Sequence, residues 1–407
     1  MITMATADTY LTDSSADSIR AAVHSREPVA GYTHSFYRYP ARFSPLFARA
    51  IIETFTIPGD LVLDVFMGGG TSLVEARALG RIAVGTDINR LSVFISKVKT
   101  TVFSKYELAN ILQWAEALVK QIKLNNPPLR AFDWAEKGYQ RNISGKSTWP
   151  IRKTIELALA QLDKLPEKRQ QSFARCALLK TAQWALDCRQ EVPAAKQFRH
   201  QFLNYIEEMT RGAWEYAKAV RVGNRLYNLV GPRRTLCLNR SAAGIEADER
   251  IKSFPTPRLI LTSPPYPGVH VLYHRWQVEG RRETPAPFWI ANCLDGSGAS
   301  FYTFGHREQK DLKGYYEKAF AAFSSLAKIA DERTILVQLV GFSEPSWQLP
   351  KFLSVLEMAG FTEVQFPVLA NSSDGRLWRC IPNRKWYADQ KGAIAASKEV
   401  VLFHRLS

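Results

Sequence analysis

Three consecutive glycines, Gly68–Gly70, constrain the fold of this chain more than any other feature. They follow the apolar segment Asp60–Phe66, which is typical of a buried strand, and they precede a helical pattern that Gly80 closes. A second strand pattern, Arg81–Ile88, comes next, and helical spacing resumes after it. The order strand, glycine turn, helix and strand predicts the start of a doubly wound, mostly parallel α/β sheet.

A glycine turn in this position suits a nucleoside ligand. Glycines let the backbone approach a ligand closely, and the N-terminus of the following helix favours negative charge. The spacing lacks the third glycine of a dinucleotide fingerprint, so a turn without a ligand stays open as an alternative. Asp87 ends the second strand, where a carboxylate can accept hydrogen bonds from the two hydroxyls of a ribose. It can equally cap the next helix, for which Asn89 is the better candidate.

The rest of the chain falls into regions of different composition. The polar residues 1–27 predict a flexible tail. Helix formers dominate residues 101–230, where strand patterns are almost absent, so we expect a helical insertion there. Strand patterns separated by helical ones return over residues 231–407. The last two strand patterns, 362–369 and 399–406, have no helix between them and predict an antiparallel hairpin at one edge of the sheet.

The chain is strongly basic, with a net charge of +16 over 407 residues. Between Lys120 and Arg234, inside the expected insertion, 22 lysines and arginines stand against 10 acidic residues. This concentration favours a polyanionic partner, nucleic acid before an anionic membrane. The five cysteines are scattered, so we expect neither a disulfide framework nor a zinc site. The sequence lacks a long apolar stretch and a signal-like start, which predicts no membrane span and a cytoplasmic location.

A further strand pattern ends abruptly in residues that suit a catalytic site. The apolar run Leu259–Leu261 ends in the sequence TSPPY (Thr262–Tyr266), and two prolines stop any strand. The amino nitrogen of a nucleobase is a poor nucleophile, because its lone pair is delocalised into the ring. The Ser263 hydroxyl and the rigidly held Pro264 carbonyl can accept its two hydrogens, and Tyr266 can stack on the base. A plain break between strand and loop is the alternative.

Together, the segments DVFMGGGT and TSPPY resemble two motifs of the exocyclic-amino DNA methyltransferases, which use S-adenosylmethionine. The first is similar to the family's Asp-x-Phe-x-Gly-x-Gly-Thr cofactor motif, and the second to its Asp/Asn/Ser-Pro-Pro-Tyr catalytic motif. The resemblance covers roughly residues 31–100 and 234–406. It implies a doubly wound, mostly parallel seven-stranded sheet of the methyltransferase type with an antiparallel last hairpin. In that fold, residues 28–100 would bind the cofactor and residues 231–407 would carry the catalytic half.

The resemblance also implies site residues at the matched positions. The segment His34–Pro45 is similar to the family's segment before the cofactor motif, with a loop before a helix cap as the alternative. Asn239 stands where the family often has an aspartate beside the cofactor adenine, and is a departure from the pattern. The implied cofactor-binding residues are Tyr39, Pro40, Phe43, Asp64, Phe66, Gly68, Gly70, Thr71, Asp87 and Asn239. The implied catalytic residues are Ser263, Pro264, Pro265 and Tyr266.

The order of the motifs resembles the permutation class whose target-recognition region lies between them. The helical insertion would then contact double-stranded DNA, with phosphate contacts placing the duplex and a few side chains reading base edges. The candidate contact loop is Tyr139–Lys153, with a solvated surface loop as the alternative. Its candidate DNA-binding residues are Arg141, Lys146, Trp149, Arg152 and Lys153.

Serine at the first position of the catalytic motif resembles the cytosine-specific branch, which methylates the exocyclic N4 of a flipped-out base. The implied role is site-specific methylation in restriction-modification or a related host defence, with a cognate endonuclease or another defence protein as a partner. Adenine N6 methylation, an RNA substrate and a DNA-binding regulator with an inactive site remain alternatives. Methylation at C5 is excluded, because no Pro-Cys dipeptide supplies the nucleophile. We predict no metal, since the pair His270 and His274 lacks an acidic partner.

Overall fold

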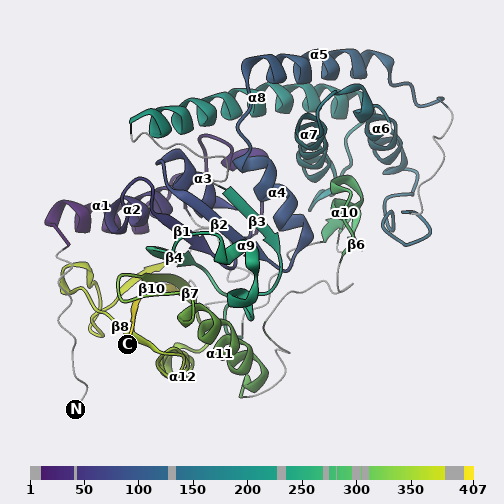
Figure 1. Ribbon diagram of the computed structural model, residues 1–407. Helices are drawn as coiled ribbons and strands as arrows, with labels where there is room; N and C mark the ends of the chain where they lie inside the picture. Colours follow the sequence, from purple (N-terminus) through teal and green to yellow (C-terminus); the bar gives the residue numbers. More distant parts are fainter. Residues whose placement is uncertain are drawn as a thin grey trace.

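The computed structural model has one large mixed sheet with helices on both faces and a helical lobe beside it (Figure 1). One face of the sheet packs on α1 and α2, and the other packs on α11 and α12. The predicted doubly wound α/β fold is confirmed. The structure describes residues 11–40, 44–126, 134–226, 235–268, 275–280, 282–295, 304, 311–380 and 398–407.

The strand order of the sheet brings the two sequence motifs together. It runs β3-β2-β1-β4-β7-β10-β8, with β9 also paired to β10. The chain builds outward from β1 in one direction and from β4 in the other, so the order reverses between these parallel neighbours. Ligands of open α/β sheets bind at the carboxyl ends of the strands at such a reversal. The strands are β1 (Leu61–Asp64), β2 (Ile82–Asp87), β3 (Thr235–Asn239), β4 (Leu259–Thr262), β7 (Ile335–Gly341), β8 (Phe361–Glu363), β9 (Leu377–Cys380) and β10 (Lys398–Leu406).

The predicted antiparallel ending is confirmed, with one correction. The last strand, β10, runs antiparallel to both β7 and β8 and lies between them. The strand expected over 362–369 is wrong beyond Glu363, because Pro367 starts a 3₁₀ turn and cannot donate to a ladder. An eighth strand, β9, pairs with the first residues of β10.

Helices fill both layers close to where the sequence places them. The helix α2 begins with Pro45 in its first turn, after Ser44 at the N-cap position. Gly80, at a φ of +79°, follows α3, as its position in the sequence indicates. The helices around the sheet are α1 (Asp13–His24), α2 (Pro45–Phe55), α3 (Thr71–Ala78), α4 (Arg90–Thr100), α9 (Glu249–Lys252), α11 (Lys313–Ala327) and α12 (Pro345–Met358).

The expectation of a flexible tail over residues 1–27 is wrong where the structure describes it. Residues 13–24 form α1, which Thr12 caps through a bond from the Ser15 N–H. Ala16 and Ile19 are fully buried and belong to the same core cluster as α2. The sequence did not indicate this helix, because most of its residues are short and polar and its apolar residues are few and mostly small.

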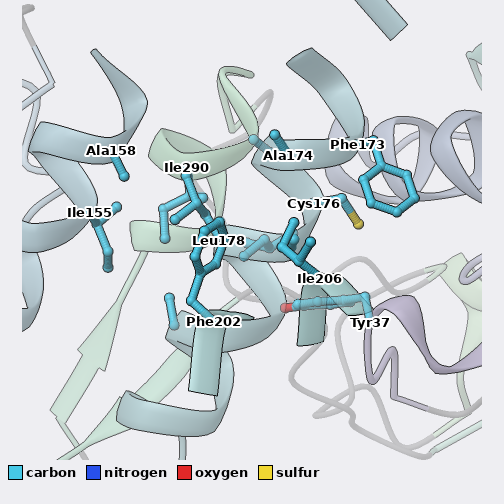
Figure 2. Close-up of a cluster of buried hydrophobic side chains, with 14 of the residues drawn as sticks. Tyr37, Ile155, Ala158, Phe173, Ala174, Cys176, Leu178, Phe202, Ile206 and Ile290 are labelled. Atoms are coloured by element: carbon cyan, nitrogen blue, oxygen red, sulfur yellow. The ribbon is translucent and has the colours of Figure 1, made fainter. Parts of the chain in front are cut away.

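The helical insertion is present and forms a lobe with its own buried cluster (Figure 2). Phe173, Cys176 and Ile206 pack there with Ile290, which follows the TSPPY segment in the sequence, and with Tyr37 from the segment before the glycine turn. The predicted border at residue 230 therefore misses the segment 275–295. The lobe contains α5 (Lys105–Gln121), α6 (Trp149–Leu159), α7 (Lys168–Leu186), α8 (Ala195–Leu226), β5 (Trp276–Val278), β6 (Arg282–Thr284) and α10 (Ala286–Ala291).

The long helix α8 joins the lobe to the sheet domain (Figure 1). Gly212 and Gly223 lie three turns apart, on one side of the helix. A Cβ at Gly212 would lie 2.1 Å from the Tyr32 carbonyl oxygen, and one at Gly223 would lie 3.2 Å from the Gly80 nitrogen. The buried Tyr216 packs between them against α3. In the described part of the chain, no helix combines the length and apolar character of a membrane crossing.

His404 is a buried titratable group on β10, between β7 and the edge strand β8. Its side chain is almost fully buried, and burial lowers the pKa of the imidazole from 6.5 to about 3, with the Arg376 charge adding to the effect. The unfolded chain takes up a proton near pH 6.5, whereas the folded protein does not. The stability that depends on neutral His404 is therefore complete above pH 6.5 and falls as the pH drops toward 3.

Replacing this group should change the acid sensitivity of the fold. We predict that His404→Leu loses less stability than the wild type as the pH falls below 6.5, by up to about 1.4 kcal/mol per pH unit. Urea unfolding across the acid range measures this, and His200→Leu on the exposed side of α8 is the control. Identical pH dependence in His404→Leu and the wild type would contradict a neutral buried imidazole.

Candidate active site

One buried carboxylate connects the glycine turn to the TSPPY turn. Asp64, at the end of β1, is 2% exposed. Its Oδ1 accepts a bond of 3.1 Å from the Phe66 N–H and one of 2.8 Å from the Thr262 hydroxyl. Its Oδ2 accepts a bond from the Ser72 hydroxyl in the first turn of α3. Burial raises the pKa of Asp64 to about 6, against the opposing effect of these hydrogen bonds. Asp64 thus fixes the relative position of the two turns.

The glycine turn needs glycine at two of its three positions. Gly68 and Gly70 have φ values of +45° and +72°, which side chains rarely adopt. A Cβ on Gly70 would lie 2.6 Å from the Ser96 hydroxyl oxygen. A Cβ on Gly68 would lie 3.2 Å from the ring of Tyr39, which therefore packs directly on the turn. Thr71 begins α3 and is buried.

A cavity opens at the carboxyl edge of the sheet, between the two turns. Of the predicted site residues, six lie on its wall: Tyr39, Phe66, Gly68, Asp87, Ser263 and Pro265. The others within the described ranges lie beside the cavity: Pro40, Asp64, Gly70, Thr71, Asn239, Pro264 and Tyr266. Phe43 lies outside the described residues. The wall also contains residues that the sequence did not point to, namely Val65, Ile88, Asn89, Arg240, Ser241, Ala242, Ala243, Phe304, Lys318, Ala321 and Ala322.

Asp87 lies on this wall with its carboxylate already oriented. It accepts a bond of 3.0 Å from the Gly68 N–H and one of 2.8 Å from the Asn89 N–H, and burial raises its pKa. The cap of α4 is Asn89, which accepts from the Leu91 N–H and donates to the Tyr39 hydroxyl. The alternative of Asp87 as a simple helix cap is therefore wrong, since Asn89 has that role.

Asn239 does not face the cavity. Its amide donates to the carbonyls of Asp87 and Ile88 at 3.0 and 2.9 Å and so braces the end of β2. The expected side-chain contact between Asn239 and an adenine is therefore wrong for this conformation, because the amide nitrogen is engaged with backbone. The residues just after it, from Arg240 to Ala243, form the wall instead.

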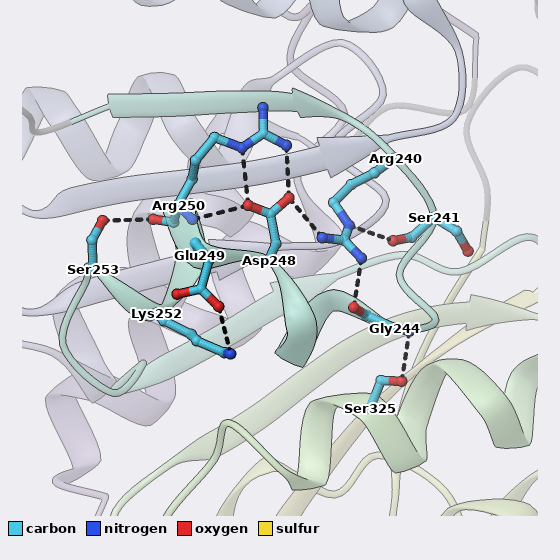
Figure 3. Close-up of polar contacts among 9 residues, drawn as sticks. All are labelled: Arg240, Ser241, Gly244, Asp248, Glu249, Arg250, Lys252, Ser253 and Ser325. Atoms are coloured by element: carbon cyan, nitrogen blue, oxygen red, sulfur yellow. Dashed lines mark hydrogen bonds and ion pairs between the residues drawn. The ribbon is translucent and has the colours of Figure 1, made fainter.

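The loop after β3 is held in shape by an arginine network (Figure 3). Arg240 donates to Asp248 at 2.7 Å and to the Gly244 carbonyl at 2.6 Å, and the Gly244 N–H donates to Ser325 on α11. Bonds from Arg250 and Arg240 hold the pKa of Asp248 well below its usual range. This network fixes the backbone of the cavity wall while leaving its small side chains facing the cavity.

The TSPPY turn presents its serine with lone pairs available. The Ser263 hydroxyl donates a bond of 2.9 Å to the Leu339 carbonyl on β7, so its proton is engaged and its oxygen can accept. The Pro265 carbonyl accepts a bond of 2.7 Å from the Tyr315 hydroxyl on α11. Within the described ranges, no donor reaches the Pro264 carbonyl.

Tyr266 is anchored by a buried ion pair that the sequence did not reveal. Its hydroxyl donates to Glu399 at 2.5 Å, and Glu399 accepts a bond of 2.6 Å from Arg379. Burial and the Glu399 charge raise the pKa of Tyr266 well above its usual value. A Cβ on Gly341 would lie 2.8 Å from the Tyr266 ring, so the ring packs closely against the end of β7. The only sequence signal was a pair of charges inside otherwise apolar strands.

The predicted DNA-contact loop is only partly accessible. Arg141 and Lys146 are exposed, and Trp149 is 38% exposed. Arg152 is partly buried and donates to Gln140. DNA contact by Lys153 is wrong for this conformation, because its side chain is only 4% exposed and pairs with Glu156.

Comparison with known proteins agrees with the cofactor half of this site. Residues 16–97 match a family model described as DNA methylase. This match confirms the resemblance to the exocyclic-amino DNA methyltransferases over residues 16–97. Over 95 residues the chain is 38% identical to the type II methyltransferase M.MvaI of Kocuria varians. This match covers 23% of this chain and 21% of that protein. Over 64 residues it is 41% identical to the type II methyltransferase M1.MboII of Moraxella bovis, covering 16% of this chain and 24% of that protein.

These matches span less than a quarter of the relatives' own length. The crystal structure of TrmN from Thermus thermophilus aligns with a TM-score of 0.30 and 10% identity, over 90% of this chain and 49% of that chain. The family model matches residues 16–97, which contain the glycine turn and Asp87.

Removing the Asp64 carboxylate should destabilise the whole edge of the sheet. Asp64→Ala leaves two hydroxyls and one N–H without their acceptor, and we expect a loss of about 3 kcal/mol or more in the free energy of unfolding. Thr262→Val breaks one of these bonds and should cost about 1 kcal/mol. The control Thr181→Val removes a bond within its own helix at an equally buried site. Urea unfolding would contradict the role of Asp64 if Asp64→Ala were no less stable than Thr181→Val.

Proposed function

We propose that the cavity binds S-adenosylmethionine. Asp87 offers a fixed carboxylate for the ribose hydroxyls, and the glycine turn leaves room for close approach of a ligand. Ile88 and the small residues after Arg240 supply apolar surface for an adenine. Tyr39 and Gly68 line the part of the wall suited to the methionine end. Bound there, the cofactor supplies an electrophilic methyl carbon on a sulfonium.

We further propose that the chain is a site-specific DNA methyltransferase that acts on the exocyclic N4 of cytosine. The observation that carries this is Ser263, which lies on the cavity wall with its proton donated to Leu339. Its oxygen is thereby left as an acceptor. The serine in this motif favours cytosine over adenine through the family resemblance.

The chemistry follows from acceptors held in place before the substrate arrives. The Ser263 oxygen and the Pro264 carbonyl accept the two amino hydrogens and draw the nitrogen toward a tetrahedral shape, which localises its lone pair. Two prolines and the bond from Tyr315 to Pro265 hold that backbone rigid. The lone pair of the amino nitrogen would then be directed at the methyl group that the cofactor would supply, and water could take the proton that the amino group loses.

Tyr266 would stack on the flipped base. Flipping costs a few kcal/mol, which contacts within the site must offset. The bond to Glu399 fixes the plane of the ring, so little entropy is lost when a base stacks on it. In this role Glu399 and Arg379 are positioning residues, since they act through Tyr266.

The helical lobe would contact double-stranded DNA, in keeping with its positive charge. The proposed setting is a restriction-modification or related defence system in the cytoplasm, with a cognate endonuclease or another defence protein as partner. The relatives named above are type II methyltransferases, which supports this setting.

The identity of the methylated base tests the proposal. Incubation of the protein with labelled S-adenosylmethionine and unmodified duplex DNA, followed by nucleoside mass spectrometry, should yield N4-methylcytosine. Ser263→Ala should lower turnover at least about 100-fold, because one preorganised acceptor is lost, while cofactor binding stays close to wild type. N6-methyladenine would contradict the choice of base, and label in RNA alone would contradict the DNA substrate.

The anchoring of Tyr266 can be tested separately. Tyr266→Phe keeps the ring and loses the bond to Glu399, so we expect turnover on DNA to fall about tenfold with unchanged cofactor affinity. Glu399→Leu, which leaves the Tyr266 hydroxyl without its acceptor, should lower turnover at least as much. The double variant should be no less active than Glu399→Leu alone, because both changes remove the same bond. The control Tyr316→Phe loses a bond to the Gln348 carbonyl away from the turn. Additive effects would contradict a shared role.

A further inference from the structure

A basic hollow lies on the helical lobe, outside the cavity and outside the predicted contact loop. Its cations are Arg38, Lys180 and Arg189, and its aromatic residues are Trp184 and Tyr205. The Lys180 ammonium lies 4.4 Å from the centre of the Tyr205 ring, and the Arg189 guanidinium lies 5.1 Å from that of Trp184. Cations packed on aromatic faces keep their charge accessible while losing little freedom on binding an anion.

The hollow is fixed to the wall of the cofactor cavity by one glutamine. The Gln183 side-chain amide accepts from the Arg38 N–H at 3.2 Å and donates to the Arg38 carbonyl at 3.1 Å. It therefore holds the backbone between Tyr37 and Tyr39 on both sides. Tyr37 and Tyr39 point inward and are buried, whereas the Arg38 side chain is 66% exposed. Since Tyr39 is on the cavity wall, Arg38 lies one residue from it.

The hollow also borders the segment that follows the catalytic turn. The Gln277 N–H donates to Asp187, and the Cys188 N–H donates to the Gln277 carbonyl at 2.8 Å. Asp187 pairs with Arg38 at 3.1 Å, so the segment before the glycine turn and the segment after the TSPPY turn meet at this place. A duplex whose backbone lay over the hollow would contact both segments.

We infer that the basic hollow binds the phosphodiester backbone of duplex DNA next to the flipped nucleotide. This rests on the proposed function and names the surface that positions its substrate. Asp187 and Glu208 pair with Arg38 and Lys180 in the free protein. In each pair one partner is well exposed, Arg38 at 66% and Glu208 at 47%, so each pair contributes only about 1 kcal/mol and phosphates can replace the carboxylates as partners. Ser35, which donates to Glu208, adds a hydroxyl that can turn to a phosphate oxygen.

The salt dependence of binding to a random-sequence duplex tests this assignment. Arg38→Gln and Arg189→Gln should each lower the slope of log affinity against log salt by about 1, because each phosphate contact releases about one counterion. The control Arg333→Gln removes an arginine of similar exposure that pairs with Asp331. Arg333 lies just before β7, at the amino-terminal end of that strand, whereas the cavity lies at the carboxyl ends of the strands. The control should leave the slope unchanged.

One variant should strengthen binding, which a structural role would not predict. Glu208→Gln removes the anion that competes for Lys180, so we expect tighter DNA binding at low salt. Unchanged slopes in both arginine variants, or weaker binding by Glu208→Gln, would overturn the inference. Loss of S-adenosylmethionine binding in Arg38→Gln would also overturn it, because Arg38 would then act through Tyr39. If the wild type itself bound no duplex, the proposed function would fail instead.

Discussion

The bonds to the Asp64 carboxylate are the interaction on which the rest of this site depends. A buried carboxylate is stable only if its oxygens are satisfied, and here the donors come from Phe66, Ser72 and Thr262. Phe66 lies two residues before the glycine turn, Ser72 lies in α3, and Thr262 is the first residue of the TSPPY turn. Satisfying one charge therefore brings the start of both turns to the same point. The reversal of strand order between β1 and β4 makes this possible.

The sequence was most informative where backbone chemistry is restrictive. Gly68 and Gly70 require left-handed backbone, and Pro264 and Pro265 stop a strand, so both turns could be located before the fold was known. Proximity in space was harder to predict. Glu399 and Arg379 lie more than a hundred residues beyond Tyr266. The pairing of β10 with β7 places Glu399 beside Gly341, where Tyr266 packs, and the pairing of β9 with β10 places Arg379 opposite Glu399.

Other predictions were wrong because the same short sequence pattern can make different tertiary contacts. Asn239 has the right place in the chain for a ligand contact, but neighbouring carbonyls take its amide. The charge of Lys153 alone predicted a phosphate contact. Its position on α6 instead points the side chain toward the interior of the lobe, where it pairs with Glu156. The segment 275–295 joins the helical lobe through Trp276 and Ile290, although it follows the catalytic turn in sequence. In each case a tertiary contact outweighs the local pattern.

The central claim is that the glycine turn and the TSPPY turn form one active site. The most direct measurement is a crystal structure with bound S-adenosylhomocysteine. The account predicts the ribose hydroxyls on Asp87 and the sulfur beside Ser263 and Pro265, with Asp64 bonded only to the protein. A ligand bound away from Ser263, or held directly by the Asp64 carboxylate, would contradict it.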